Sequence, residues 1–313
     1  MLRQEAVADV AQPAIELHAP PIARGWLARV RVYLALTKPR IIVLLLVTTV
    51  PAMILAEGGM PSLLLIAITL LGGTLAAGGA NAINCYFDRD IDGIMARTRD
   101  RPLPAGTVEP TRALVFGLAL GVIAFAILTL GANIVAASLA IAALAFYVLV
   151  YTLWLKRSTT QNIVIGGAAG AMPPLVGWAA VTGGLDWAAL VMFGIIFLWT
   201  PPHFWALALR YRGDYARAGV PMLPAVRGVD ETKRQILLYS VVLVASTFLL
   251  IPTAGLGIVY FASALLLGGA FVGLAFRLWR EPTPSASRAL FLYSLIYLAA
   301  LFVAMGADEL LPL

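Results

Sequence analysis

The segment from Ser62 to Asp92, SLLLIAITLLGGTLAAGGANAINCYFDRDID, joins a long apolar run to a short acidic one. Residues 62–87 contain no charged side chain, and a helix of that length exceeds the roughly 30 Å thickness of a bilayer's hydrocarbon core. Asn84, Asp88 and Asp92 recur every four residues at its end, which places them on one helix face over about two turns. The segment therefore predicts a membrane-spanning helix that ends in an oxygen-rich face.

The composition extends this prediction to the whole chain. Of its 313 residues, 61% are hydrophobic and only 12% are charged, and the mean hydropathy is +0.91. A soluble core cannot hold that many apolar residues, whereas blocks of about twenty apolar residues match a bilayer. The fold class is therefore all-α, a polytopic membrane protein whose nine transmembrane helices are expected near residues 41–56, 62–87, 112–131, 134–155, 162–182, 187–209, 235–252, 257–279 and 288–306.

The distribution of cations predicts the orientation. With these helices, all 22 Lys and Arg fall on one side of the membrane, and loops such as 57–61, 131–133 and 182–186 on the other side contain none. The positive-inside rule then places the N-terminus in the cytoplasm and the C-terminus outside a bacterial cytoplasmic (inner) membrane. The net charge of +6 is explained by topology, so no nucleic-acid partner is expected. Polar residues 1–30 are predicted to form a mobile cytosolic arm, followed by a transmembrane domain over 31–313.

The residues around the acidic motif predict its chemistry. Asn84, Asp88 and Asp92 supply hard oxygen donors, and cations fall in segments on the same side of the membrane, namely Arg97, Arg99, Arg101, Lys156, Arg157, Arg210, Arg212 and Arg217. A magnesium-bridged diphosphate needs this combination, because the metal joins carboxylate to phosphate and cations balance the remaining charge. The pattern indicates chemistry on a lipid-soluble diphosphate. Asp90 and Asp100 are interpreted as solvated loop residues.

A weak internal repeat predicts a second half of the site. Arg101-Pro-Leu-Pro-Ala105 reappears 120 residues later as Pro221-Met-Leu-Pro-Ala225, and the same offset relates the second, third and fourth predicted helices to the sixth, seventh and eighth. The loop containing Asp214 and Arg217 then corresponds to the loop after the acidic motif. The two loops are expected to face each other across one site.

Two proline pairs lie beside residues whose role the sequence leaves open. Pro201-Pro202 precedes His203 and is expected to break the sixth helix, leaving His203 either as a packing residue or as a group that faces a substrate. The small residues 166–171 precede Pro173-Pro174 and allow either close helix packing or room for a bulky ligand.

Three segments, residues 84–103, 199–205 and 214–224, resemble the haem-modifying branch of the UbiA family of intramembrane prenyltransferases. The resemblance rests on the Asn84, Asp88 and Asp92 motif, on Asp-Arg-Asp-Ile-Asp, Met-x-Arg-Thr-Arg and Trp-Thr-Pro-Pro-His, and on Ala-Gly-Val-Pro-Met-Leu-Pro. It implies a nine-helix bundle around a central cavity and transfer of a farnesyl group from farnesyl diphosphate to a vinyl group of haem b. Bound Mg²⁺, with Mn²⁺ as an alternative, is implied as well.

The resemblance also assigns roles to residues. Asn84, Asp88, Asp92 and Asp214 are expected to hold the metal, with the first three as the catalytic motif, and the residues expected to bind substrate are Arg97, Arg101, Lys156, His203, Asp214, Arg217 and Tyr151. The second acidic segment has only Asp214 where relatives often have paired aspartates, and Thr152 replaces the tyrosine usual four residues before Lys156.

The family resemblance also implies partners for the protein, and two rival functions remain. Expected partners are farnesyl diphosphate, haem b, membrane lipid and a haem A synthase or terminal oxidase assembly. A related enzyme acting on another aromatic or tetrapyrrole acceptor is the nearest rival. A secondary transporter fits less well, because its ionisable residues should lie near the membrane midplane, whereas here they crowd one surface.

Overall fold

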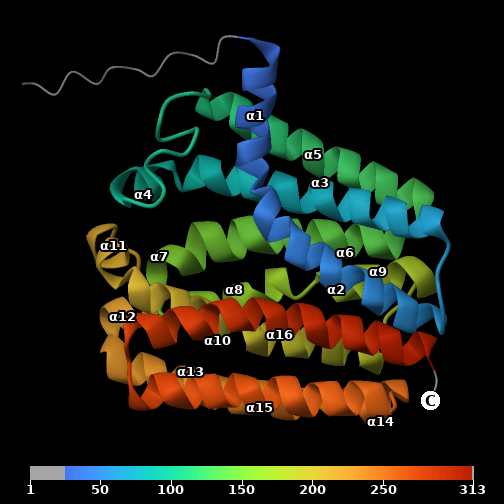
Figure 1. Cartoon of the computed structure of the whole chain (residues 1–313). Helices are drawn as coiled ribbons and strands as arrows, with labels where there is room; N and C mark the ends of the chain where they lie inside the picture. Colours follow the sequence, from blue (N-terminus) through green and yellow to red (C-terminus); the bar gives the residue numbers. More distant parts are fainter. Residues whose placement is uncertain (1–24, 312–313) are drawn as a thin grey trace, which may run out of the picture.

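The computed structural model describes residues 25–311, and the secondary structure of that part of the chain is helical throughout (Figure 1). Its helices are α1 (Trp26–Thr37), α2 (Pro39–Glu57), α3 (Leu63–Phe87), α4 (Arg89–Ile94), α5 (Pro110–Gly131), α6 (Ile134–Ala145), the π-helix η1 (Phe146–Leu155), α7 (Lys156–Ser158), α8 (Asn162–Gly170), α9 (Pro173–Thr182), α10 (Trp187–Arg210), α11 (Arg212–Arg217), α12 (Leu223–Val226), α13 (Gly228–Thr247), α14 (Leu250–Ala254), α15 (Ile258–Arg280) and α16 (Pro284–Leu310).

The predicted set of nine membrane spans is confirmed within residues 25–311. They are Pro39–Glu57, Leu63–Phe87, Pro110–Gly131, Ile134–Ser158, Asn162–Thr182, Trp187–Arg210, Gly228–Ala254, Ile258–Arg280 and Pro284–Leu310. The seventh begins earlier than predicted, at Gly228, because its charged first turn is helical. Asp230 and Glu231 lie in that turn, where carboxylates interact favourably with the positive end of the helix dipole. Most of the predicted N-terminal arm lies outside the described residues, and residues 26–30 belong to α1.

The two proline pairs behave differently. The predicted break at Pro201-Pro202 is wrong, because α10 continues from Trp187 to Arg210 with both prolines inside it. Proline is tolerated within a membrane helix when surrounding packing compensates for the lost backbone bond, and both prolines are buried here. Pro173-Pro174 instead begins α9 after α8 has ended at Gly170, so the fifth span is divided into two helices.

One arrangement of helices occurs twice in the structure. In each case a long helix (α3 or α10) is followed by a short helix (α4 or α11) and a proline-containing loop, and then by a second long helix (α5 or α13) that packs against the first. The short elements α4, α7, α11 and α12 gather at one end of the bundle (Figure 1). The loops that the sequence repeat relates therefore lie at the same end.

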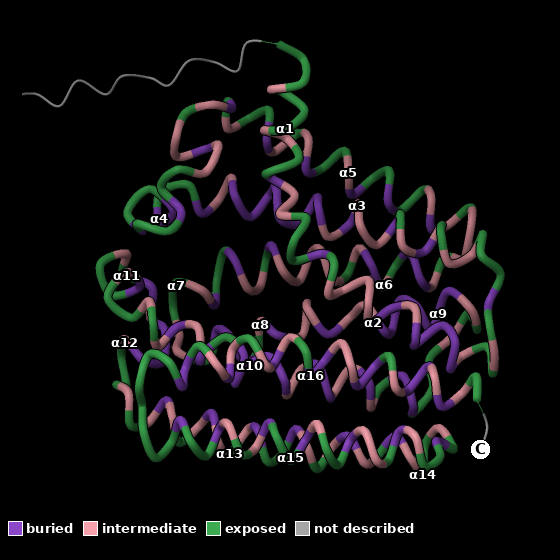
Figure 2. The backbone as a smooth tube through the Cα atoms, viewed as in Figure 1, coloured by how far each residue is buried: buried purple, intermediate pink, exposed green. Residues whose placement is uncertain are grey.

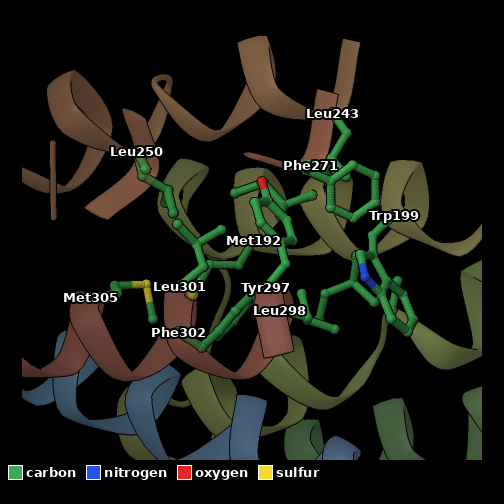
Figure 3. Close-up of a cluster of buried hydrophobic side chains, with 14 of the residues drawn as sticks. Met192, Trp199, Leu243, Leu250, Phe271, Tyr297, Leu298, Leu301, Phe302 and Met305 are labelled. Carbon is green, nitrogen blue, oxygen red and sulfur yellow. The ribbon is translucent and has the colours of Figure 1, made fainter. Parts of the chain in front are cut away.

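The main hydrophobic core lies among α10, α13, α15 and α16, and it fixes the position of α10. Met192, Leu243, Phe271 and Tyr297 interdigitate there (Figure 3) and are almost fully buried. The buried residues run along the inner faces of the long helices, while many outward-facing residues are exposed (Figure 2). Such outward apolar residues are expected where lipid replaces water.

Close packing of α3 on α5 positions the helix that carries the acidic motif. A Cβ atom added to Gly79 would lie 2.6 Å from the carbonyl oxygen of Gly117, and one added to Gly117 would lie 2.9 Å from that of Gly79. The two backbones therefore approach each other more closely than any side chain permits, as is common between membrane helices. This contact lies one to two turns from Asn84.

Candidate active site

Asn84, Asp88 and Asp92 form the centre of the site and remain stacked as predicted. Asp88 separates α3 from α4, yet its backbone N–H donates to the Asn84 carbonyl at 2.9 Å, and the Asp92 N–H donates to the Asp88 carbonyl at 2.8 Å. The Asn84 amide Nδ2 also donates to Asp88 Oδ2 at 2.7 Å. All three residues are at most 3% exposed. A helix-like backbone thus carries the motif past the end of the membrane helix.

Two cations from distant segments neutralise the two buried carboxylates. Lys156, at the start of α7, donates to Asp88 Oδ2 at 2.5 Å, and Arg101, in the loop after α4, donates to Asp92 Oδ2 at 2.8 Å. Hydrogen bonds between ionised groups are stronger than those between neutral groups. Buried carboxylates without such partners would carry a large desolvation cost, so these pairs explain how the motif is tolerated at this depth. Both cations are among the predicted binding residues.

Lys38 is a member of the site that sequence reasoning treated only as a determinant of topology. Its Nζ donates to Asn84 Oδ1 at 2.8 Å. Lys38 links α1 to α2 in the left-handed conformation, with φ of +53°, which is uncommon for a residue other than glycine. Burial lowers the pKa of the Lys38 ammonium because the charged form loses hydration. No sequence pattern pairs it with Asn84, which lies 46 residues away.

A π-helix contributes Thr152, which the sequence analysis noted only as a departure from the family pattern. Over Phe146–Leu155 the fourth membrane span adopts the wider π geometry, which is rare and often occurs at functional sites. Thr152 is fully buried there and accepts a hydrogen bond from Asn84 Nδ2 at 3.0 Å, while its own hydroxyl donates to the Tyr147 carbonyl. Tyr147 and Tyr151 stack at 5.3 Å between ring centroids. Thr152 therefore contacts the motif, at the position where the family resemblance implied a tyrosine.

The Asp90 and Asp100 side chains are both exposed, as interpreted, but Asp90 also forms an ion pair. Arg157 donates to both oxygens of Asp90, at 2.7 and 2.8 Å, and also to the Phe87 carbonyl. The hydrogen bonds from Arg157 lower the pKa of Asp90 to about 2. The Asp100 side chain is 90% exposed. The pair of Asp90 and Arg157 thus links α4 to α7, at the end of the fourth membrane span, beside the motif.

The second predicted half-site lies beside the first. Ile91 and Met95, in and just after α4, share a buried apolar cluster with Tyr215 of α11. Arg97 lies over the ring of Tyr211 at 5.6 Å. Burial raises the pKa of the Tyr215 hydroxyl, while Arg97, close enough to hydrogen-bond to it, acts in the opposite direction. The loops after α3 and α10 are therefore in contact.

Asp214 and Arg217 pair with each other across one turn of α11. In the described residues, no three Asp, Glu, His or Cys side chains converge on a common point, so Asp214 does not complete a three-carboxylate cluster with Asp88 and Asp92. Its expected role at a metal remains a prediction.

The small residues of α8 serve close packing. A Cβ on Gly166 would lie 2.3 Å from Cδ2 of Tyr151, and one on Gly167 would lie 2.9 Å from Thr200 on α10. For these two glycines, the packing interpretation of the small-residue run is confirmed. The same contacts hold the Tyr151 side of the site against α10.

His203 is buried on α10 and contacts α16. Its Nδ1 lies 2.6 Å from Ser294 Oγ, and no hydrogen bond joins it to the acidic motif within residues 25–311.

The donor set of the motif fits a magnesium ion. Asp88 Oδ1 is buried and has no hydrogen-bond partner in the described part of the chain, and Arg157 Nη2 is 3.8 Å from it, beyond hydrogen-bond distance, so this carboxylate oxygen can coordinate. Mg²⁺ prefers oxygen ligands and is usually held by one or two carboxylates together with waters and substrate phosphates. Asp88, Asp92 and the Asn84 amide oxygen provide such a partial set, which a diphosphate would complete.

Comparison with known proteins gives a consistent result. The profile of the UbiA prenyltransferase family matches residues 45–302. The protoheme IX farnesyltransferase of Gloeobacter violaceus is 58% identical over 279 residues, covering 89% of this chain and 92% of that protein. Protoheme IX farnesyltransferase 1 of Saccharopolyspora erythraea is 56% identical over 306 residues, covering 96% of each chain.

Solved structures share the fold at low sequence identity. A digeranylgeranylglyceryl phosphate synthase is similar over 90% of this chain and 98% of its own, with a TM-score of 0.73 and 18% identity. A UbiA homologue from Archaeoglobus fulgidus, bound to DMAPP and Mg²⁺, covers 87% of this chain and 98% of its own, with a TM-score of 0.60 and 15% identity.

Proposed function

The chain belongs to the UbiA prenyltransferase family, and on that premise we propose that it transfers a farnesyl group from farnesyl diphosphate to a vinyl group of haem b. The observation that carries the proposal is the high identity, over nearly the whole chain, to proteins named protoheme IX farnesyltransferase. The buried motif with its cations supports the same proposal, because it supplies the charges that an allylic diphosphate requires.

Asn84, Asp88 and Asp92 would hold Mg²⁺, with Asp214 contributing from the facing loop. The ion would supply Lewis acidity that stabilises negative charge on the diphosphate. Lys156 and Arg101 lie 2.5 and 2.8 Å from the carboxylates of the motif, and they would interact with the phosphate oxygens of a bound diphosphate. Arg97 and Arg217 extend this positive region from the two facing loops.

The chemistry then requires only positioned charge and the exclusion of water. The allylic C–O bond breaks, and the diphosphate leaves with the electron pair, stabilised by fixed positive groups. The π electrons of a haem vinyl group form the new C–C bond, and water adds to the resulting cation with loss of a proton, giving a hydroxyethylfarnesyl side chain. The faces of the stacked rings of Tyr147 and Tyr151 can stabilise the carbocation.

We also propose the cellular setting that the cation distribution predicts. The end of the bundle with α4, α7 and α11 faces the cytoplasm of a bacterial inner membrane, and the C-terminus faces outward. A haem A synthase or a terminal oxidase assembly would receive the product.

The test uses membranes that contain the full chain, supplied with haem b, farnesyl diphosphate and Mg²⁺, and extracted haems are analysed by mass. Asp88→Ala and Asp92→Ala should each lower product formation at least about 100-fold, since each removes a carboxylate that would hold the metal ion that stabilises the departing diphosphate. Asp100→Ala, at an exposed carboxylate, should behave as wild type. Prenylation of a different acceptor, with haem b left unmodified, would support the rival prenyltransferase. Full turnover by either motif variant would refute the role of the motif.

A further inference from the structure

His203 is held by contacts on three sides. Its ring stacks on Trp199 at 4.2 Å between centroids and 17° between planes, and on Phe291 at 4.8 Å and 25°. Its Nδ1 lies 2.6 Å from Ser294 Oγ. Trp199 and His203 are one helical turn apart on α10, so the stacking depends on α10 continuing through its two prolines. Figure 3 shows Trp199 projecting from α10 among side chains of the core.

Ser294 contacts the rings of both Trp199 and His203. Its backbone carbonyl accepts a hydrogen bond from Trp199 Nε1 at 2.8 Å, while its side chain meets His203. Both Ser294 and His203 are buried, at 0% and 7% exposure. The first contact belongs to the backbone and survives any substitution of the Ser294 side chain. Removing the hydroxyl therefore tests the His203 contact alone.

The hydrogen-bond network determines which His203 nitrogen carries the proton. Ser294 Oγ lies 2.6 Å from the Phe291 carbonyl oxygen. A carbonyl can only accept, so the single hydroxyl proton of Ser294 must be donated to Phe291. The 2.6 Å contact with His203 then requires a proton on Nδ1, because two lone pairs would repel at that distance. Neutral His203 is therefore the Nδ1–H tautomer, and Nε2 carries a lone pair.

The Nε2 atom is available to a ligand. It makes no hydrogen bond to the described residues. His203 as a whole is 7% exposed, so the residue is not fully enclosed. Because Trp199 and Phe291 cover both ring faces, a ligand can approach only in the plane of the ring. That is the direction in which imidazole binds a metal.

We propose that Ser294 is a positioning residue that holds His203 as the Nδ1–H tautomer, so that Nε2 binds the iron of the haem substrate. The proposal rests on the proposed function, which supplies haem b as substrate. Histidines that bind metals commonly donate their other ring N–H to an oxygen acceptor, which fixes the tautomer and ring orientation. Binding transfers no proton, since Nε2 already has its lone pair and Nδ1 keeps its hydrogen.

The first measurement is the tautomer itself, without haem. The sequence contains two histidines, so a His18→Gln background leaves His203 as the single reporter, with an affinity tag free of histidine. In the full-length protein with ¹⁵N-labelled imidazole, Nδ1 should give a protonated resonance and Nε2 an unprotonated one. Ser294→Ala should shift this pattern toward a mixture with the other tautomer, and Ser294→Thr should restore it.

Ser287→Ala is the matched control. Ser287 lies on the same helix and is 4% exposed, and its Oγ donates to the Ala206 carbonyl of α10 at 2.5 Å. The Ser287→Ala variant thus removes an equivalent hydroxyl from the contact between α16 and α10 and leaves the His203 imidazole unaffected. A general loosening of α16 would affect both alanine variants, whereas loss of the His203 partner affects only Ser294→Ala.

The second measurement is titration of the purified protein with ferric haem b, followed by the Soret band. Ser294→Ala should weaken haem affinity about tenfold, at the lower end of the cost of losing a partner of a metal-binding histidine. Its affinity for farnesyl diphosphate should be unchanged. His203→Ala should abolish the imidazole-ligated spectrum, and Ser287→Ala should match wild type.

A wild-type tautomer pattern and haem spectrum in Ser294→Ala would overturn the inference. Haem farnesylation by a wild-type protein whose bound haem shows no imidazole ligation would overturn it while leaving the proposed function intact. If the protein prenylates another acceptor but forms no farnesylated haem, the proposed function is refuted. The tautomer measurement, which needs no haem, would then still test whether Ser294 positions His203.

Discussion

Replacing Asp88 by asparagine should destabilise the metal-free protein even before activity is considered. Asp88→Asn keeps the shape of the side chain but removes the charge that Lys156 contacts at 2.5 Å. The Asp88 side chain is 1% exposed and that of Lys156 is 15% exposed, so the substitution leaves a nearly buried ammonium without its counter-ion. Breaking a buried ion pair on one side costs about 3 to 5 kcal/mol. We expect about 3 kcal/mol, because the Lys156 side chain retains some contact with solvent.

A double-mutant cycle separates this structural role from the catalytic one. In Asp88→Asn combined with Lys156→Met, no unpaired charge remains, so stability should recover by about 2 kcal/mol relative to Asp88→Asn alone. Turnover should stay abolished, since the negative charge of the carboxylate and the cation are both gone. The assay is reversible unfolding of detergent-solubilised protein with chelator present, and product formation is measured in parallel.

The exposed pair of Glu109 and Arg112 provides the control cycle. These side chains are 58% and 74% exposed and lie 2.9 Å apart, so their coupling energy should be below about 1 kcal/mol. A coupling energy for Asp88 and Lys156 no larger than this control value would refute the view that the motif is neutralised by its own cations.

Three further predictions follow from other contacts. Gly166→Ala should destabilise the protein by about 1 to 3 kcal/mol, because its Cβ would lie 2.3 Å from the Tyr151 ring. Gly170→Ala, whose Cβ would have no atom within 4 Å, should leave stability unchanged. Equal unfolding free energies for the two variants would contradict this prediction. Without the native cysteine, a cysteine replacing Gly59 should react with an impermeant thiol reagent only from outside, and one replacing Asp100 only from the cytoplasm; the opposite labelling would reverse the orientation. Exhaustive chelation should abolish turnover and Mg²⁺ or Mn²⁺ should restore it; undiminished product after chelation would exclude a metal requirement.

The sequence predicted the spans and the motif well because both depend on local periodicity. The hydropathy of each span reflects its lipid surroundings, and the four-residue spacing of Asn84, Asp88 and Asp92 produces stacking in any helix-like backbone. The backbone hydrogen bonds that continue past the end of α3 preserve that stacking.

Lys38 and Thr152 escaped prediction for two different physical reasons. Lys38 reaches Asn84 from a left-handed turn 46 residues away, and a contact of that kind leaves no trace in local spacing. Thr152 depends on a π-helix, because the wider turn determines which residue faces the motif, and an apolar run gives no sign of which helical form it adopts. Proline propensity also misled at Pro201-Pro202, since packing outweighed it in α10 but not before Pro173.

The pairing of Asp88 with Lys156 and of Asp92 with Arg101 makes metal and diphosphate affinities interdependent. These two pairs sum to zero charge, so a divalent cation alone would add uncompensated positive charge to a buried site, and a diphosphate alone would add uncompensated negative charge. Binding both together offsets most of the charge that each would add alone. Each ligand should therefore raise the affinity for the other by the same factor, as thermodynamic reciprocity requires. A site whose carboxylates are already paired with cations thus favours the metal-diphosphate complex over either component.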